Sequence, residues 1–157
     1  MKNGPDMGHD YVSYDMAVLL VFIQFISLSL LALSGPILPE SYLSLSLYMA
    51  AAVAGMFALQ AMRRSKLRIS PNVHPEAKLV TNGIYRFIRH PMYLAVLLGA
   101  VGMLVNQYTP LRIGITVTLL VDLIIKMIYE ERLLQKKFGE EYREYRKKTK
   151  RLIPFIF

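Results

Sequence analysis

Two clusters of side chains in this 157-residue sequence have the chemistry to bind a charged ligand or move a proton. The first is the segment 81–93, in which Arg89 and His90 stand directly before an apolar run, and the second is Glu130-Glu131. Guanidinium, imidazole and carboxylate groups form strong charge-assisted hydrogen bonds, and histidine or glutamate can act as an acid or a base. Taken singly, each cluster also reads as an interface anchor or a solvated helix start.

Several common catalytic signatures are absent from the sequence. There is no cysteine, so a thiolate nucleophile and a thiolate metal site are excluded. No P-loop, no dinucleotide-binding glycine motif, no H-E-x-x-H and no G-x-S-x-G occurs. Because His9, His74 and His90 are widely separated along the chain, we expect no metal site.

Composition and charge indicate a membrane protein. The chain is 54% hydrophobic with a mean hydropathy of +0.36, above the roughly 45–50% apolar content of soluble domains. Its net charge of +8 is concentrated in residues 63–89 and 132–151, whereas the connections 35–41 and 106–110 carry no basic residue. This is the positive-inside pattern, which predicts contact with membrane lipids and accounts for the charge without a nucleic-acid partner.

Four apolar runs predict an all-α integral membrane fold with about four transmembrane helices. Runs 16–33 and 42–62 are uncharged and close to the ~20 residues that span a bilayer. Run 92–105 is short unless 84–90 adds to it, and run 111–129 completes the set. With the basic segments on one side, both termini are expected in the cytoplasm.

Features within and between these runs refine the expected helices. Small residues of the second run form a face that favours close helix packing: Ala50, Ala51, Ala54, Gly55 and Ala58. Pro91 suits the first position of the third helix. Asp122 and Lys126, four residues apart in the fourth run, are either a mutual ion pair or functional charges.

The ends of the chain are expected to differ in structure. Residues 1–14, which contain Gly4, Pro5 and Gly8, predict a flexible start that is ordered only in part. From Glu130 onward, apolar residues recur near the helical period among many charges, which predicts a basic amphipathic C-terminal helix. The long connection between the second and third runs is irregular, and its length favours a functional loop. If the third and fourth runs form a hairpin, segment 81–93 and Glu130-Glu131 meet at its cytoplasmic end.

The motifs and their order resemble those of the isoprenylcysteine carboxyl methyltransferase family, which belongs with the phospholipid methyltransferases. The similar segments are Ile84–Tyr93 with its R-H-P-x-Y, E-E-x-x-L at 130–134, F-G-x-E-Y at 138–142, and Ile153-Pro154. They lie within residues 76–154, about half of the chain. The resemblance implies an integral membrane, multi-pass enzyme that transfers a methyl group from S-adenosylmethionine to a lipophilic or lipidated acceptor, with its active site facing the cytoplasm.

The resemblance also implies a division of the single domain 1–157 and a set of site residues. Residues 1–75 would form a helical-hairpin membrane anchor and loop, and residues 76–157 the cofactor-binding core. The cofactor would be held by Leu79, Val80, Gly83, Tyr85, His90, Pro91, Tyr93, Glu130 and Glu131.

The residue types suit this cofactor. Its ammonium would pair with a carboxylate such as Glu131, its carboxylate with arginine or histidine, and its sulfonium with an aromatic face such as Tyr85 or Tyr93. A carboxylate acceptor needs only orientation, by Arg89 or Lys126.

An amine or thiol acceptor would instead need a base, with His90 or Glu130 as candidates. Which acceptor is used stays open at this level: isoprenylcysteine carboxylate, phospholipid or lipophilic thiol. An NADPH-dependent membrane reductase and a non-catalytic bundle with a lipid-binding basic tail are the alternatives of other classes. The oligomeric state is not indicated.

Overall fold

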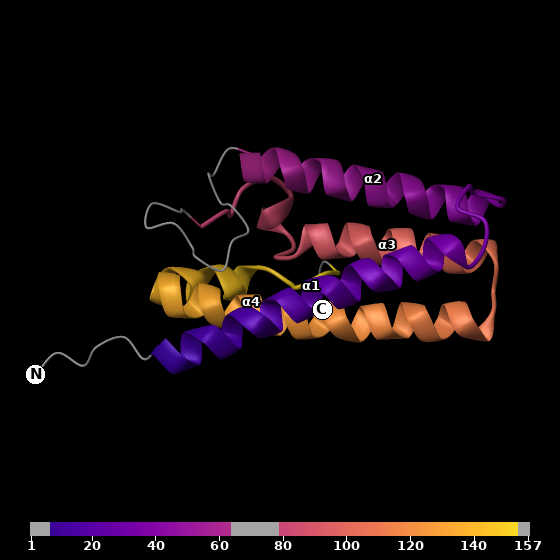
Figure 1. The fold of residues 1–157 in the computed structure, drawn as a ribbon. Coiled ribbons are helices and arrows are strands. Elements are labelled where there is room, and N and C mark those ends of the chain that lie inside the picture. Colours follow the sequence, from indigo (N-terminus) through magenta and orange to yellow (C-terminus); the bar gives the residue numbers. More distant parts are fainter. Residues whose placement is uncertain (1–6, 64–78, 154–157) are drawn as a thin grey trace, which may run out of the picture.

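The computed structural model describes residues 7–63 and 79–153, and within them the regular structure is almost entirely helical (Figure 1). In chain order the elements are α1 (Met7–Leu33), α2 (Tyr42–Arg63), the 3-10 helix η1 (Gly83–Arg86), α3 (Pro91–Asn106) and α4 (Pro110–Lys148). The expectation of an all-α fold is confirmed. Pro91 is the first residue of α3, as predicted.

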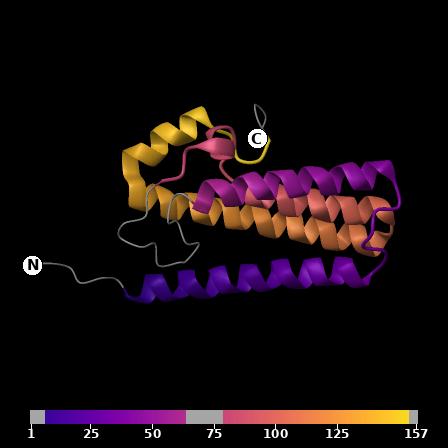
Figure 2. The same ribbon diagram turned by 90° about the horizontal axis from the view of Figure 1, so that it is seen from above.

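The helices form an elongated bundle. Helices α2, α3 and α4 run side by side, and α1 lies along one side of them (Figures 1 and 2). α1 packs mainly against α4, and α2 packs closely against α3. A small core of Leu31, Ala100, Leu119 and Leu123 joins α1, α3 and α4.

The small-residue face of α2 packs within the chain. Ala54 and Ala58 are buried, and a Cβ added at Gly55 would lie 3.6 Å from the Cβ of Ala95 in α3. At Gly102 of α3, an added Cβ would come within 2.6 Å of the Tyr48 ring of α2. Small side chains therefore allow the two helices to approach closely, which confirms the interpretation of this face as a packing surface.

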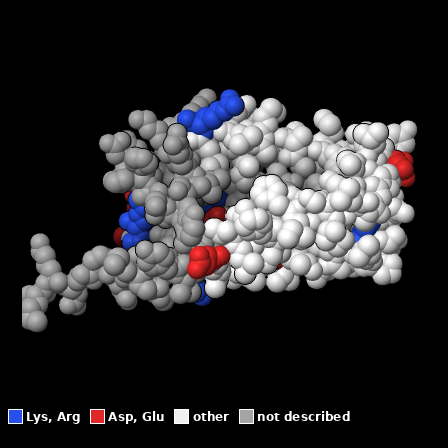
Figure 3. All heavy atoms as spheres, viewed as in Figure 1, with Lys and Arg blue, Asp and Glu red and all other residues white. Residues whose placement is uncertain are grey.

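Two segments, Asp15–Leu33 of α1 and α2, are long and apolar enough to cross a membrane, and α3 is a shorter apolar helix. Large apolar side chains on α1 are exposed in the chain itself, including Phe22 at 60% and Phe25 at 62%. Figure 3 shows a face that is uncharged along most of its length, with lysine and arginine side chains gathered towards one end. Such a surface is suited to contact with lipid.

The start of α1 differs from the expectation. The helix begins at Met7, so more of the segment 1–14 is helical than the expected flexible, partly ordered start implied. Pro5 precedes the helix and no proline interrupts it, so Gly8 alone is not enough to prevent helix formation there. Most of the connection between α2 and η1, residues 64–78, and the last residues, 154–157, lie outside the described residues.

The expected C-terminal amphipathic segment is helical, and it continues α4 with a sharp turn. α4 runs without interruption to Phe138 and then turns at Gly139, whose backbone has φ 54° and ψ −118°. Side-chain-bearing residues rarely adopt positive φ, so glycine permits this turn. The short helical segment after Gly139 returns towards the start of α3 (Figure 2), and Lys150 forms an isolated parallel bridge with Ile88.

Arg112 joins three segments at the other end of the bundle. Its fully buried guanidinium donates hydrogen bonds to the carbonyl oxygens of Leu31 (2.9 Å) and Met103 (2.6 Å) and to Oγ of Ser34 (3.0 Å). The carbonyls belong to the last turns of α1 and α3, which lack partners within their own helices. Arg112 therefore caps two helices from a third.

Candidate functional site

The backbone between η1 and α3 is fixed by the C-terminal segment. The backbone N–H of Arg89 donates to the carbonyl of Lys150 (2.7 Å), and that of His90 donates to the carbonyl of Arg151 (3.0 Å). In return, the N–H of Lys150 donates to the carbonyl of Phe87 (3.2 Å). These three bonds place Arg89 and His90 at the point where α3 begins and hold the end of the chain beside them.

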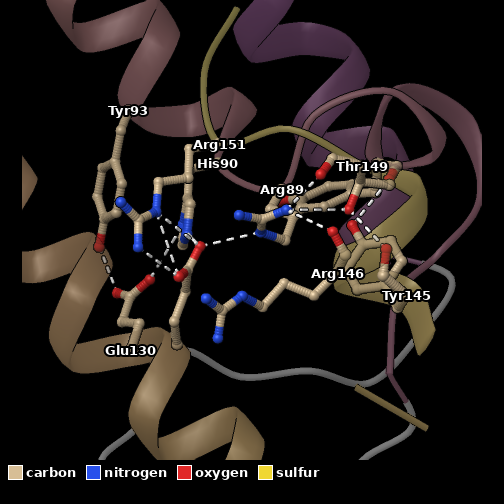
Figure 4. A network of polar contacts seen from close by, with 10 residues as sticks. Arg89, His90, Tyr93, Glu130, Tyr145, Arg146, Thr149 and Arg151 are labelled. Atoms are coloured by element: carbon tan, nitrogen blue, oxygen red, sulfur yellow. Dashed lines mark hydrogen bonds and ion pairs between the residues drawn. The ribbon is translucent and has the colours of Figure 1, made fainter. Parts of the chain in front are cut away.

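A buried ion pair connects this segment to α4. Nε of Arg89 lies 2.9 Å from Oε1 of Glu131, and the two side chains are 8% and 5% exposed. Arg151 adds a second pair, with Nη2 3.0 Å from Oε2 of Glu131. Figure 4 shows both guanidinium groups directed towards the same carboxylate. The prediction that segment 81–93 and Glu130-Glu131 meet is confirmed by these contacts.

A second nitrogen of the Arg89 guanidinium binds the end of α4. Its Nη1 donates to the carbonyl oxygen of Thr149 and, at 3.3 Å, to that of Arg146. Both carbonyls lie at the end of α4, where backbone oxygens have no helical partner. Arg89 therefore ties the turn-back segment to Glu131 through Nε and Nη1.

His90 lies between the two glutamates. Nδ1 is 3.6 Å from Oε2 of Glu130, and Nε2 is 3.4 Å from Oε1 of Glu131, an approach without hydrogen-bond geometry. Its ring stacks on that of Tyr93 with centroids 5.5 Å apart, and the Tyr93 hydroxyl donates a hydrogen bond to Oε1 of Glu130. In its protonated form His90 would pair with both carboxylates.

The two adjacent glutamates have different surroundings. Glu131 is buried and bound by two arginines, whereas the side chain of Glu130 is 34% exposed. Burial alone would raise the pKa of Glu131, but the neighbouring His90, Arg151 and Arg89 groups hold it well below its usual range. Glu131 thus stays charged near neutral pH and holds the site together, and Glu130 is the carboxylate that solvent reaches.

Tyr85 is held from the turn-back segment. Its backbone carbonyl accepts a hydrogen bond of 2.7 Å from the hydroxyl of Tyr145. Burial, reinforced by the Glu130 charge, raises the pKa of Tyr85 to about 12, so its hydroxyl stays neutral and can donate. Gly83 starts η1 with φ 60°, and an added Cβ there would lie 3.6 Å from Ala61 of α2.

The other expected site residues differ in how far they are buried. Val80 and Pro91 are buried and Leu79 is half-buried. Lys126 is one turn of α4 away from Glu130, and its ammonium lies 5.2 Å from the Tyr93 ring centroid while donating to Oε1 of Gln24 in α1. Arg86, by contrast, is exposed.

Sequence reasoning missed the part of the site that comes from the end of the chain. Arg151, Thr149 and Tyr145 received no role in the predicted site, yet they contact Glu131, Arg89 and Tyr85. The sequence held a sign that this segment contributes to the site, because Ile153-Pro154, one of the family-like motifs, lies just after Arg151. Gln24 was missed as well; it is the one amide in a run of apolar and hydroxyl residues.

Comparison with known proteins shows similarity over the region that builds this site. The family model described as phospholipid methyltransferase matches residues 37–141. A curated relative from Oryza sativa subsp. indica, named probable protein-S-isoprenylcysteine O-methyltransferase, is 41% identical over 80 residues, which are 50% of this chain and 42% of the relative.

Two further relatives have related names. Protein-S-isoprenylcysteine O-methyltransferase B of Arabidopsis thaliana is 35% identical over 80 residues, covering 50% of this chain and 41% of that protein. Protein-S-isoprenylcysteine O-methyltransferase of Schizosaccharomyces pombe is 35% identical over 86 residues, covering 50% of this chain and 34% of that protein. The chain thus spans less than half the length of these relatives.

Proposed function

The chain belongs to the phospholipid methyltransferase family, and we propose on that premise that it transfers a methyl group from S-adenosylmethionine to a lipophilic acceptor at the cytoplasmic surface of a membrane. The observation that carries the proposal is the placement of Tyr93 and His90 beside the partly exposed carboxylate of Glu130. The neighbouring Arg89–Glu131 ion pair holds this arrangement in place. The acceptor proposed first is of the isoprenylcysteine carboxylate type, because the relatives carry that name.

The membrane placement forms part of the proposal. α1, α2, α3 and the apolar part of α4 would cross the bilayer, with both termini and the basic segments in the cytoplasm. Two observations support this arrangement: the long apolar helices α1 and α2, and the concentration of lysine and arginine near one end of the bundle. The candidate site then lies where a water-soluble cofactor meets a lipid-dissolved acceptor. A reporter fused after Phe157 should therefore read as cytoplasmic.

The donor set fits the cofactor. Glu130 is a partly exposed carboxylate suited to the cofactor's ammonium, a contact for which its exposure makes it better placed than the buried Glu131. The positive field of Arg89, Arg151 and His90 attracts the cofactor's carboxylate. The rings of Tyr85 and Tyr93 offer electron-rich faces to a sulfonium. Leu79, Val80, Gly83 and Pro91 would complete the surface around it.

Bound S-adenosylmethionine supplies an electrophilic methyl group, so the protein's task is to hold the acceptor in line with it. Arg89 positions Glu131 and the end of α4, and its committed hydrogen bonds favour this role over direct contact with an acceptor. Lys126, deeper in the bundle, remains the proposed cation for orienting a carboxylate acceptor. For an acceptor that loses a proton, Glu130 or His90 would receive it.

The test is equilibrium binding of S-adenosylmethionine to the detergent-purified chain, followed by transfer of a labelled methyl group into prenylcysteine analogues, phospholipids and lipophilic thiols. Glu130→Gln should weaken cofactor binding by about tenfold or more, because it removes a charged partner, and Lys147→Ala on the exposed part of α4 should not. Absence of saturable binding, or of label in every acceptor, would contradict the proposal. Saturable NADPH binding instead would favour the reductase.

A further inference from the structure

Asp122 is a buried acidic residue that the site described above does not use. It is 3% exposed, and it lies between Leu119 and Leu123, two members of the core that joins α1, α3 and α4. Within residues 7–63 and 79–153, neither of its carboxyl oxygens has a hydrogen-bond partner. A buried carboxyl group without a partner costs free energy, so the fold itself gains nothing from an aspartate at this position.

Lys126 does not neutralise Asp122 by direct pairing. The ion pair between these residues, one of the two interpretations left open by the sequence, is not formed in the described part of the chain. The Lys126 ammonium instead donates to Oε1 of Gln24 and lies over the ring of Tyr93. Of the two interpretations of the charges in α4, the structure favours the functional one for Asp122, since ionisable groups inside apolar bundles usually have a task.

Asp122 lies on the same face of α4 as two residues of the candidate site. Asp122, Lys126 and Glu130 follow one another at four-residue intervals, so they lie along one face of α4. At 1.5 Å per residue, Asp122 is about 12 Å along the helix from Glu130. It therefore lies on the apolar side of the site, where a lipid-dissolved molecule would reach it.

Access to this position is bounded by α1. This helix packs on α4 and only slightly on α3, and few of its described residues are buried: Leu20, Ser27 and Leu31. It precedes the residues 37–141 that the family model matches. A long apolar molecule could thus enter between α1 and α3, which pack on each other only slightly, without disturbing the tightly packed α2 and α3.

We propose that Asp122 accepts a hydrogen bond from an N–H group of the lipophilic acceptor bound between α1, α3 and α4. An acceptor that brings a donor satisfies this buried carboxyl group, which has no hydrogen-bond partner among the described residues. Two kinds of molecule carry such a group beside a long apolar chain: a lipidated cysteine derivative with its amide, and a lipid amine. This inference rests on the proposed function, since it assigns the acceptor side of the same site.

The experiment measures equilibrium binding of two matched pairs of probes to the full chain in detergent micelles, without cofactor. The first pair is S-farnesyl-N-acetylcysteine and S-farnesylthiopropionic acid, which lacks the N–H. The second is a long-chain primary amine and its trimethylammonium counterpart, which keeps the charge but has no donor. We expect one donor probe to bind about tenfold more tightly than its partner, and the pair that shows this ratio identifies the source of the N–H.

Asp122→Leu should reduce that ratio to about one, and Asp122→Asn, which keeps a carbonyl oxygen, should give an intermediate ratio. Thr116→Val is the matched control, because this buried hydroxyl of the same helix is satisfied by the Arg112 carbonyl (2.8 Å). It should leave the ratio unchanged. The thermal midpoint of Asp122→Leu should equal or exceed that of the wild type, since an unpaired carboxyl is replaced by an apolar group.

A ratio near one for both pairs in the wild type, a ratio that survives Asp122→Leu, or a marked fall in the thermal midpoint of that variant would each overturn the inference. Binding is measured apart from catalysis. An absence of methyl transfer with an intact binding ratio would therefore contradict the proposed function alone.

Discussion

Arg89 and Glu131 form a buried ion pair in which Nε lies 2.9 Å from Oε1. The pair joins the segment before α3 to the middle of α4, two parts of the chain separated by 42 positions. Arg151 binds the same carboxylate from the end of the chain. Three segments thus depend on one glutamate, and its removal tests how the site is held.

Glu131→Ala should lower the free energy of unfolding by about 3–5 kcal/mol, because it leaves the Arg89 charge buried without its partner. The midpoint of thermal unfolding in detergent, followed by circular dichroism, measures the effect. Lys147→Ala, which removes an exposed ion pair with Glu144, is the control and should leave the midpoint unchanged. Equal midpoints for the two variants would show that the buried pair does not stabilise the fold.

Stability should also fall in acid. The pKa of Glu131 is lower in the folded chain than its usual value of 4.5, so the folded state binds the proton less readily than the unfolded state does. The resulting stabilisation is fully present above pH 4.5 and is lost as the pH falls towards the folded pKa. Unfolding midpoints measured between pH 7 and pH 3 should show this loss in the wild type. The loss should be smaller in Glu131→Gln. If the unfolding midpoint falls with pH equally steeply in the wild type and in Glu131→Gln, the acid sensitivity belongs to other groups.

The turn at Gly139 should not tolerate a side chain. Gly139→Ala forces a residue with a Cβ into φ 54°, at a cost of about 1–3 kcal/mol, although space is available around the position. The turn brings Lys150 and Arg151 to the start of α3, so cofactor affinity should fall together with the thermal midpoint. Gly99→Ala in α3 is the control, because it meets no neighbour and has ordinary helical backbone, and it should be neutral or slightly stabilising. Unchanged cofactor affinity in Gly139→Ala would separate the turn from the site.

Substitution of Arg112 should lower the stability of the fold without changing the affinity of the candidate site for S-adenosylmethionine. Arg112→Met removes the hydrogen bonds to the carbonyls of Leu31 and Met103. It should cost about 1–3 kcal/mol, because the Met103 carbonyl loses its donor, whereas the Leu31 carbonyl keeps a hydrogen bond from the Ser34 hydroxyl. Arg112→Lys should rescue only in part, because one ammonium does not reproduce the fork of a guanidinium. The thermal midpoint reports the loss, and S-adenosylmethionine affinity measured at a temperature where the variant is folded should match the wild type. A large change in that affinity would indicate that the two ends of the bundle are coupled.

The sequence by itself determined the helices and the meeting of the two clusters. Hydropathy and proline placement locate the apolar parts of α1 to α4, because these signals act over a few neighbouring residues. The order of R-H-P-x-Y and E-E-x-x-L also indicated the family, and the hairpin of α3 and α4 placed Arg89 near Glu131.

Only the tertiary structure decided which polar groups are held in internal ion pairs and hydrogen bonds and which can bind a ligand. Glu130 and Glu131 are neighbours of the same type, yet one is partly exposed and the other is bound by two arginines. That difference depends on Arg151, which reaches Glu131 because a single positive φ at Gly139 reverses the chain. The tertiary structure likewise decided that Lys126 donates its hydrogen bond to Gln24 and not to Asp122. Hydropathy and motif spacing are local in the sequence, whereas these pairings depend on side-chain directions set by contacts between residues far apart in it.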